Sequence, residues 1–244
     1  MHVRRQEGRR RLAMLVGVVA VASLAGAAWG ISRSPLLDVD RVEVEGAVHT
    51  GAGAVRAASG IRPGEAMVDV SGASSARRVA RLPWVRSVVV RREWPATVRI
   101  RVVERLAAAA TRAADGGWAL LDLSGRVLDH VAEVPGNLVV LEGLPPAGPP
   151  GSGLQRAEAG LLQVVAALPP ALVPRVRAVA PGEGGPEGGE IELRLRPQGA
   201  VRLGRPDQVV PKLVAALAVL AAVDARTVGT VDVRIPEAPV LTRR

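Results

Sequence analysis

The sequence contains no cysteine, no phenylalanine and no tyrosine, and it has only four tryptophans in 244 residues. The absence of cysteine excludes disulfide bonds and thiolate zinc sites, so packing alone must hold the fold together. The absence of phenylalanine and tyrosine means that the core is built mostly from Val, Leu and Ala. Because 48% of the residues are hydrophobic, such a core can still be large.

Lysine is also nearly absent, since Lys212 is the only one beside 31 arginines, and the net charge of +9 is unevenly spread. Residues 1–33 hold six arginines and one glutamate, whereas the remaining 211 positions hold 26 basic and 22 acidic residues. A nucleic-acid-binding surface needs a concentrated basic face and usually stacking aromatics. The main part of the chain shows neither, so no nucleic-acid partner is predicted.

The first uncharged stretch of the chain, residues 12–32, has the length of a membrane span. Twenty helical residues rise about 30 Å, which matches the hydrocarbon thickness of a bilayer. Five arginines crowd the segment 4–11 before it, and only Arg33 follows closely. Because positive charge is retained in the cytoplasm, we predict a cytoplasmic tail at 1–11, a transmembrane helix at 12–32 and an extracytoplasmic bulk.

A cleaved signal peptide is the alternative interpretation of this segment. Ala25-Gly26-Ala27 has the small-x-small pattern that a signal peptidase accepts. The apolar run is longer than a usual signal-peptide core and continues past this motif through Trp29 and Ile31, which favours an uncleaved anchor. Both interpretations place residues 36–244 outside the cytoplasm.

The first region after the anchor predicts a strand–helix–helix–strand–strand order. Alternating apolar and charged residues indicate strands, and apolar residues at helical spacing indicate helices. Thr50 is expected to cap the first helix, and Trp84 and Trp94 are expected to supply buried apolar surface. The predicted elements are a strand at 39–45, helices at 51–59 and 74–82, and strands at 85–92 and 97–104 joined by a short hairpin loop at 93–96.

The second region predicts a mixed α+β domain that ends in a strand at 228–235, followed by a tail at 237–244. A hairpin is expected around Ser124-Gly125, and a glycine-rich loop is expected at 181–189. The other predicted elements are strands at 118–123, 126–131, 138–142, 175–180, 190–196 and 200–204, and helices at 154–168 and 206–223.

No pattern of catalytic, cofactor-binding or metal-binding residues is present, so the sequence predicts a chain that is not an enzyme. There is no nucleophile elbow, no Ser-x-x-Lys pair and no phosphate loop ending in Gly-Lys. His2, His49 and His130 lack neighbours at metal-ligand spacing. The carboxylate pairs Asp38/Asp40 and Glu43/Glu45 fall on a predicted solvent-facing side of a strand.

One segment is specific enough to suggest a family. Residues 82–105 read Leu-Pro-Trp-Val-Arg-Ser-Val-Val-Val-Arg-Arg-Glu-Trp-Pro-Ala-Thr-Val-Arg-Ile-Arg-Val-Val-Glu-Arg, which resembles the heart of the FtsQ/DivIB family of bacterial division proteins. Residues 42–46, 120–128, 204–213 and 231–236 are similar to other parts of that family, whereas Ala107 stands where the family usually has proline. The motif residues are Gly46, Pro83, Trp84, Val85, Arg91, Arg92, Trp94, Pro95, Glu104 and Arg105.

This resemblance implies a POTRA domain at 36–106 and the family's β domain at 107–236. It implies a non-enzymatic bitopic scaffold of the divisome, a single-pass type II protein of the cell membrane concentrated at the septum. Such a scaffold links cytoplasmic and extracytoplasmic division proteins during septum assembly, through FtsB/DivIC-like and FtsL-like partners. The alternative is an exported POTRA-containing component of a secretion or envelope-assembly machine.

The last predicted strand is the candidate partner site. A final strand is expected at a sheet edge, where unpaired N–H and C=O groups accept a partner strand. The prolines that would blunt such an edge, Pro236 and Pro239, follow the strand and leave its body open. The resemblance implies pairing with FtsB-like proteins in the same part of the chain. The candidate residues are Val228, Thr230, Val231, Asp232, Val233, Arg234 and Ile235.

Overall fold

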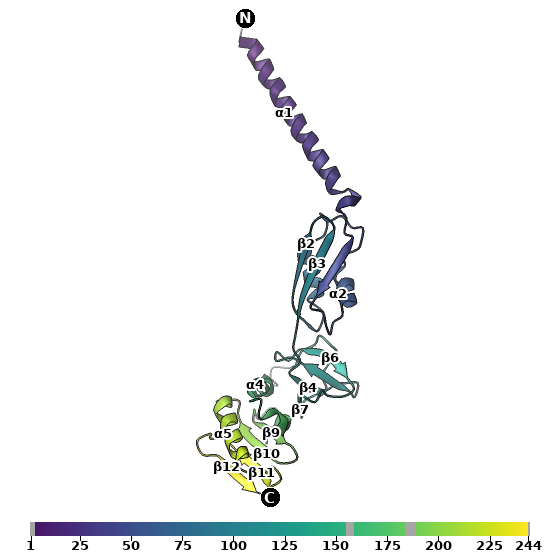
Figure 1. Ribbon diagram of the computed structural model, residues 1–244. Helices are drawn as coiled ribbons and strands as arrows, with labels where there is room; N and C mark the ends of the chain where they lie inside the picture. Colours follow the sequence, from purple (N-terminus) through teal and green to yellow (C-terminus); the bar gives the residue numbers. More distant parts are fainter. Residues whose placement is uncertain (1–2, 155–158, 184–188, 244) are drawn as a thin grey trace. The chain divides into compact units, whose positions relative to one another are not determined.

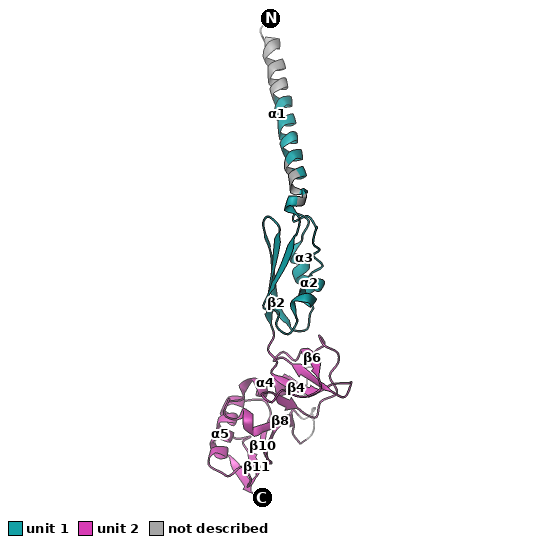
Figure 2. Cartoon of the chain, turned by 45° about the vertical axis from the view of Figure 1, so that its right-hand side comes forward, with its two compact units in different colours: residues 1–104 teal, residues 105–244 magenta. Residues whose placement is uncertain are grey.

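The computed structural model describes residues 3–154, 159–183 and 189–243. The chain divides into two compact units, residues 1–104 and 105–244 (Figure 2). Most of the predicted glycine-rich loop at 181–189 lies outside the described residues, and so does the start of the predicted helix at 154–168.

The first unit begins with a long helix, α1 (Val3–Ser32; Figure 1). Within the part of the chain that the structure describes, none of the helices is both long enough and apolar enough to cross a bilayer. The membrane span expected at 12–32 therefore stays a prediction.

The rest of the first unit has the predicted strand–helix–helix–strand–strand order. Its sheet runs β1-β3-β2, with β1 parallel and β2 antiparallel to the central strand. Val98, Ile100 and Val102 alternate along β3 into a core shared with the helices, as their spacing predicted. The elements are η1 (Pro35–Leu37), β1 (Arg41–Glu45), α2 (Ala52–Ser59), α3 (Gly72–Val79), β2 (Val85–Glu93) and β3 (Thr97–Glu104).

The helix starts in this unit differ from those expected. The residue that precedes α2 as its cap is Gly51, and no side chain caps the helix there, so the expected Thr50 cap is wrong. The backbone N–H of Thr50 instead donates to Glu104 Oε1 at 2.8 Å. Helix α3 starts two residues earlier than expected because the hydroxyl of Ser71 caps it by accepting the N–H of Ser74.

The two tryptophans of the first unit have different surroundings. Trp84 is 8% exposed, as expected, and its ring stacks on that of His49 with centroids 4.3 Å apart. Trp94 is 53% exposed in the β2–β3 connection, so its expected burial is wrong. The connection lies beyond the alternating part of the hairpin and does not direct this ring into the core.

The second unit is built on one nine-stranded mixed sheet, in the order β12-β11-β10-β9-β8-β7-β4-β5-β6. Helix α4 packs on β8, and α5 packs on β10 and β11, so both helices cover the core side of the sheet. The elements are β4 (Ala109–Arg112), β5 (Trp118–Leu121), β6 (Val127–Val131), β7 (Val139–Leu141), α4 (Ala159–Ala167), η3 (Val173–Arg175), β8 (Val176–Pro181), β9 (Ile191–Leu195), β10 (Ala200–Gly204), α5 (Val209–Ala221), β11 (Val228–Asp232) and β12 (Val240–Arg243).

Two of these strands were not predicted. Strand β4 lies between β7 and β5 in the sheet. Three of its residues have small side chains and are buried, namely Ala109, Ala110 and Thr111. Strand β12 occupies the segment that was expected to be a tail, and it pairs antiparallel with β11. The expectation that 228–235 is the final strand is therefore wrong.

Candidate interaction site at the C-terminal strands

One edge of the large sheet is formed by β12, with β11 one strand inside it, and the other edge is formed by β6. Strand β11 pairs parallel with β10 on one side and antiparallel with β12 on the other. Among the described residues, no strand pairs with the outer side of β12. The open edge that was expected at 228–235 is therefore occupied, and the outermost strand at this end of the sheet is Val240–Arg243.

The chain turns from β11 into β12 just after Asp232. The Asp232 carboxylate accepts the backbone N–H of Arg234 at 3.1 Å and the Arg234 guanidinium at 2.7 Å, which stops the strand. The hydrogen bonds from Arg234 lower the pKa of Asp232. A turn closed by the Ala238 N–H on the Ile235 C=O then reverses the chain. The loop that contains Pro236 and Pro239 thus connects two strands.

The hydrogen bonds of β11 show which groups of β12 face outward. The Val233 N–H donates to the Arg202 C=O of β10 at 3.0 Å. Because successive residues of a strand direct their backbone groups to opposite sides, Thr230 and Asp232 face β12. They stand opposite Thr242 and Val240, so these partners face inward. The N–H and C=O groups of the alternate residues, Leu241 and Arg243, therefore point away from the sheet.

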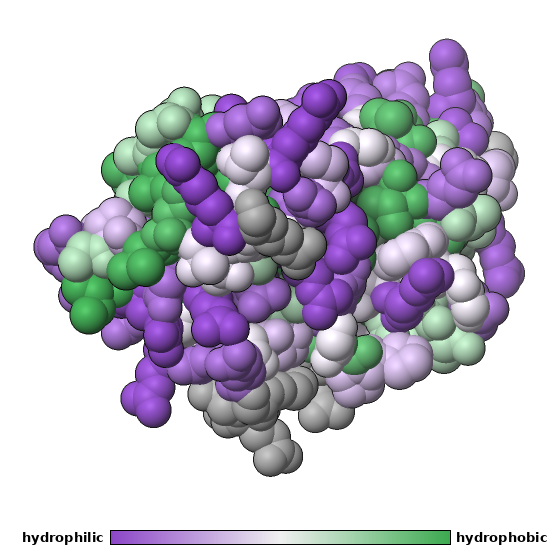
Figure 3. Space-filling view, turned by 90° about the horizontal axis from the view of Figure 1, so that it is seen from below, coloured by the Kyte–Doolittle hydropathy of each residue, from purple (hydrophilic) through white to green (hydrophobic). Residues whose placement is uncertain are grey.

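Apolar side chains accompany this free edge. Val240 is 60% exposed and Ile235 is 64% exposed, while Leu241 packs partly against the core. On helix α5, which packs on β10 and β11, Val210 and Val214 are also exposed, at 60% and 56%. Figure 3 shows this end of the molecule with separate green apolar groups between purple hydrophilic ones. The edge thus offers backbone hydrogen bonds beside apolar contact surface.

The candidate partner residues do not form one surface. Val228, Val231 and Val233 are buried in the core, and Thr230 and Asp232 are half-buried on the opposite face of the sheet. Only Arg234 and Ile235 are exposed. Sequence reasoning missed β12, for which Val240-Leu241-Thr242 was the only local signal.

The motif residues mainly support the fold. Gly46 has a φ of 80°, and a Cβ there would lie 2.1 Å from the Val102 carbonyl oxygen. Arg105 donates to Asp122 Oδ2 at 2.7 Å. Burial raises the pKa of Asp122, but hydrogen bonds from Ser124, Arg126 and Arg105 outweigh it and lower the pKa. Pro83 and Val85 flank the buried Trp84 at the start of β2.

Within the described residues, no group of three or more His, Asp or Glu side chains is arranged to hold a metal ion. His130 is instead bound on both ring nitrogens, by Asp115 Oδ2 at 2.9 Å and by the Gly148 carbonyl at 3.0 Å. Asp38 takes part in an isolated bridge with Ala66. Glu43 and Glu45 pair with Arg99, at 3.1 and 2.6 Å. These carboxylates stabilise the outer face of the small sheet.

Two family models match the chain in succession. Residues 37–105 match the model described as "POTRA domain, FtsQ-type", and residues 109–234 match "Cell division protein FtsQ/DivIB, C-terminal". The two compact units therefore define a cell division protein that combines a POTRA domain with a second, sheet-based domain. The chain belongs to the FtsQ/DivIB family, as the motif at 82–105 indicated.

Curated relatives agree with this assignment. The "Cell division protein FtsQ" of Streptomyces collinus is 30% identical over 96% of this chain and 90% of its own length. The protein of the same name from Corynebacterium glutamicum is 34% identical over 57% of each chain. The chain spans 35% and 51% of the relatives from Rhodothermus marinus and Streptomyces bingchenggensis.

A solved structure also resembles this chain. It is the major extracytoplasmic domain of the trans isomer of the cell division protein DivIB from Geobacillus stearothermophilus. The match has a TM-score of 0.35 and 20% identity, and covers 50% of this chain and 95% of that one. This likeness is too partial to add to the family assignment.

Proposed function

We propose that this chain is a non-enzymatic bitopic scaffold of the divisome, which links cytoplasmic and extracytoplasmic division proteins during septum assembly. Membership of a cell division family supports this role. The unpaired outer side of β12 supports the proposal further, because an exposed strand edge can accept a strand of another protein. The proposed partners are FtsB/DivIC-like and FtsL-like membrane proteins.

The cellular role is tested by depletion of the protein with microscopy of the cells. Filamentous or branched cells with unfinished septa are the expected result, because septum assembly would lose a link between its components. Normal septation in depleted cells would contradict the proposed role.

The anchor is proposed at residues 12–32, with the N-terminus in the cytoplasm. Its support is the uncharged sequence of this segment, the arginines before it and the helical backbone of α1. Trp29 is 65% exposed, and the Arg33 guanidinium lies 5.4 Å from the centre of its ring. Such a pair suits the outer membrane–water interface.

Protease added to intact spheroplasts tests this orientation. It should digest the bulk of the chain and spare only the tail and the anchor. A mature protein that begins at Ala28 would contradict the uncleaved anchor, and a fully protected chain would contradict the orientation.

The docking strand is proposed to add antiparallel or parallel to β12 through the outward groups of Leu241 and Arg243. The charged residues that usually blunt such an edge are few here, since Arg243 is the only one in β12. Val240 and Ile235 would then supply apolar contacts that fix the register. The proposed docking strand of this chain is thus β12 and not the strand expected at 228–235, which pairs with it.

A pair of variants separates the backbone from the side chain at this edge. Leu241→Pro and Leu241→Ala both remove the leucine side chain, but only proline removes the outward N–H. We expect Leu241→Pro to weaken binding of the FtsB-like partner about tenfold more than Leu241→Ala, since one partner group loses its hydrogen bond. Equal affinities of the two variants would contradict strand addition at this residue.

A further inference from the structure

The exposed indole of Trp94 is not explained by the fold. Trp94 belongs to the Arg-Arg-x-Trp-Pro motif at 91–95, and its expected place was the core. It is instead 53% exposed, whereas Trp84 in the same unit is 8% exposed. A large apolar ring that a motif residue leaves in solvent is available for a contact outside the unit.

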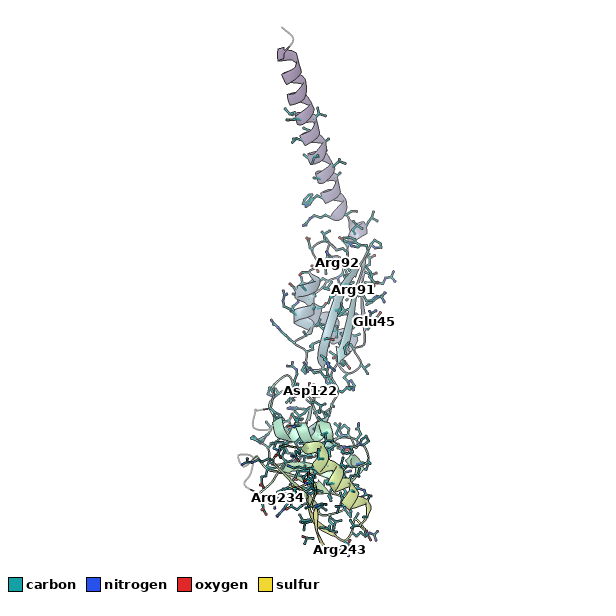
Figure 4. All side chains as sticks on the ribbon, turned by 90° about the vertical axis from the view of Figure 1, so that its left-hand side faces the viewer. Glu45, Arg91, Arg92, Asp122, Arg234 and Arg243 are labelled. Carbon is teal, nitrogen blue, oxygen red and sulfur yellow. The ribbon has the colours of Figure 1, made fainter. Side chains whose placement is uncertain are left out.

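Backbone hydrogen bonds bring three segments to the end of the unit where Trp94 lies. The Asp40 N–H donates to the Ala96 C=O at 2.8 Å, beside the hairpin connection. The Met67 N–H donates to the Leu37 C=O at 3.0 Å. The Arg92 guanidinium in turn donates to the Met67 C=O at 3.1 Å. Figure 4 shows Arg91 and Arg92 at one end of this sheet and Glu45 farther along it.

Two further apolar side chains are exposed at this end. Leu36 is 81% exposed and Val68 is 38% exposed. Leu36 precedes Leu37 in the chain, and Val68 follows Met67. Leu37 and Met67 are joined by the backbone hydrogen bond described above. Trp94, Leu36 and Val68 together form what we call the hairpin-end patch. The patch combines one amphipathic ring with two aliphatic groups.

The chain holds this patch close to the proposed membrane anchor. Leu36 follows Ser32, the last residue of α1, by four positions. Four extended residues span at most about 14 Å, so Leu36 cannot move farther than that from the end of the helix. A surface tethered at such a distance has a high effective concentration at the bilayer. Even a weak contact would therefore be formed in a large fraction of the molecules.

We propose that the hairpin-end patch docks into the outer interface of the membrane that anchors the chain. The proposal rests on the anchor proposed above. An indole ring is suited to this region, because its body is apolar and its N–H reaches the headgroups. The docking would fix the orientation of the POTRA unit against the membrane.

The charges at this end indicate that apolar insertion drives the contact. Arg33 pairs with Asp69 at 3.2 Å. The other charged side chains near the patch include both signs, namely Arg91, Arg92, Asp38, Asp40 and Glu93. A surface of mixed sign gains little from anionic lipid. Docking should therefore persist on uncharged phosphatidylcholine and change little with salt.

The absence of cysteine allows a clean site-specific test. The full chain is reconstituted in phosphatidylcholine vesicles that contain a headgroup-nitroxide lipid, and a fluorophore is attached at Arg91→Cys or at Val103→Cys. Val103 is the matched control, because it is 52% exposed on the same sheet but near the other end of β3. Flotation of the vesicles reports the anchor independently of quenching.

We expect the label at position 91 to be quenched severalfold more strongly than the label at position 103. Trp94→Ser should reduce this quenching to the level of position 103, with unchanged thermal unfolding, and Leu36→Ser should reduce it in part. Equal quenching at both positions, or quenching that Trp94→Ser and Leu36→Ser leave unchanged, would overturn the proposal. Quenching that appears only with phosphatidylglycerol would overturn apolar insertion.

The two proposals fail differently in this experiment. A chain that floats with the vesicles but shows no added quenching at position 91 keeps the anchor and refutes the docking. A chain that does not float refutes the anchor, and the docking with it. A label at position 91 that is shielded only when a protein partner is added, and not by lipid alone, would also overturn the proposed membrane contact.

Discussion

One edge strand of each unit, β1 in the first and β12 in the second, differs in whether its outward backbone groups are bonded. In the first unit, the Arg56 guanidinium donates to the Val42 C=O of β1 at 3.1 Å and so occupies an outward group of that edge. In the second unit, the outward groups of Leu241 on β12 have no such bond among the described residues. Proteins usually blunt exposed edges to prevent unwanted pairing. Of these two edges, the open edge of β12 is therefore the better candidate for partner binding.

The units also differ in what stabilises them. The first unit has a small core of Val, Ile and Met side chains. Trp84 is buried as well, and the carboxylate of Glu104 binds a loop. The second unit has a larger core of its own under α4 and α5. Damage to the first unit should therefore leave the second one folded.

The largest expected effect is that of the buried tryptophan. Trp84→Ala should lower the free energy of unfolding of the first unit by about 3–5 kcal/mol, because it leaves a cavity in a small core. Trp94→Ala, at an exposed position, should change it by less than about 0.5 kcal/mol. Denaturant-dependent hydrogen exchange resolves the two units. Equal effects of the two variants, or loss of protection in the second unit, would contradict the comparison.

The next effect concerns Glu104 and acid. Burial raises the pKa of Glu104, but hydrogen bonds from the N–H groups of His49 and Thr50 outweigh it and lower the pKa to about 2. Because the folded pKa lies below the unfolded value of 4.5, this stabilisation is complete above about pH 4.5 and is lost as the pH falls toward 2. We expect Glu104→Gln to cost about 1–2 kcal/mol at neutral pH.

The acid dependence provides the control for this variant. The unfolding free energy of the first unit should fall with pH more steeply in the parent chain than in Glu104→Gln. Asp122, whose pKa is also lowered, lies in the second unit, so the acid response of that unit should be the same in both chains. A Glu104→Gln chain that keeps the parent's acid profile in the first unit would show that this carboxylate is not the group responsible.

The smallest expected effect is that of the residue that blunts β1. Arg56→Ala should lower stability by less than about 1 kcal/mol, because a single exposed hydrogen bond is lost. It should also raise self-association, measured by sedimentation, since the Val42 carbonyl is left free at an edge. Arg86→Ala, an exposed arginine on β2, is the matched control. Equal self-association of the two variants would contradict the role of Arg56 in protecting the edge of β1.

The sequence predicted the regular parts of both units well, because their periodicity reflects burial on one side. Strand β3 alternates over eight residues, and α5 is long and apolar. Strand β12 has only four residues after two prolines, so its conformation depends on pairing with β11 rather than on its own pattern. Strand β4 is rich in alanine, a weak strand former, and is defined by its neighbours in the sheet.

The sequence interpretation placed the candidate site on a strand that lies one strand inside the sheet edge. The interpretation of 228–235 as an edge assumed that the last recognisable strand is the last strand, and the pairing of β12 with β11 removes that assumption. Trp94 shows the same limit, since hydrophobicity alone does not tell whether a ring in a hairpin connection turns inward or outward. Both errors concern positions where tertiary pairing, not local pattern, decides exposure.

The most direct test of the open edge is amide hydrogen exchange at β12 with and without the FtsB-like partner. In the free chain the Leu241 N–H should exchange fast and the Thr242 N–H slowly, because only Thr242 faces β11. Binding of the partner should protect the Leu241 amide and leave the β1 amides of the first unit unchanged. Partner binding with no added protection at Leu241, or with new protection at β1, would contradict this account.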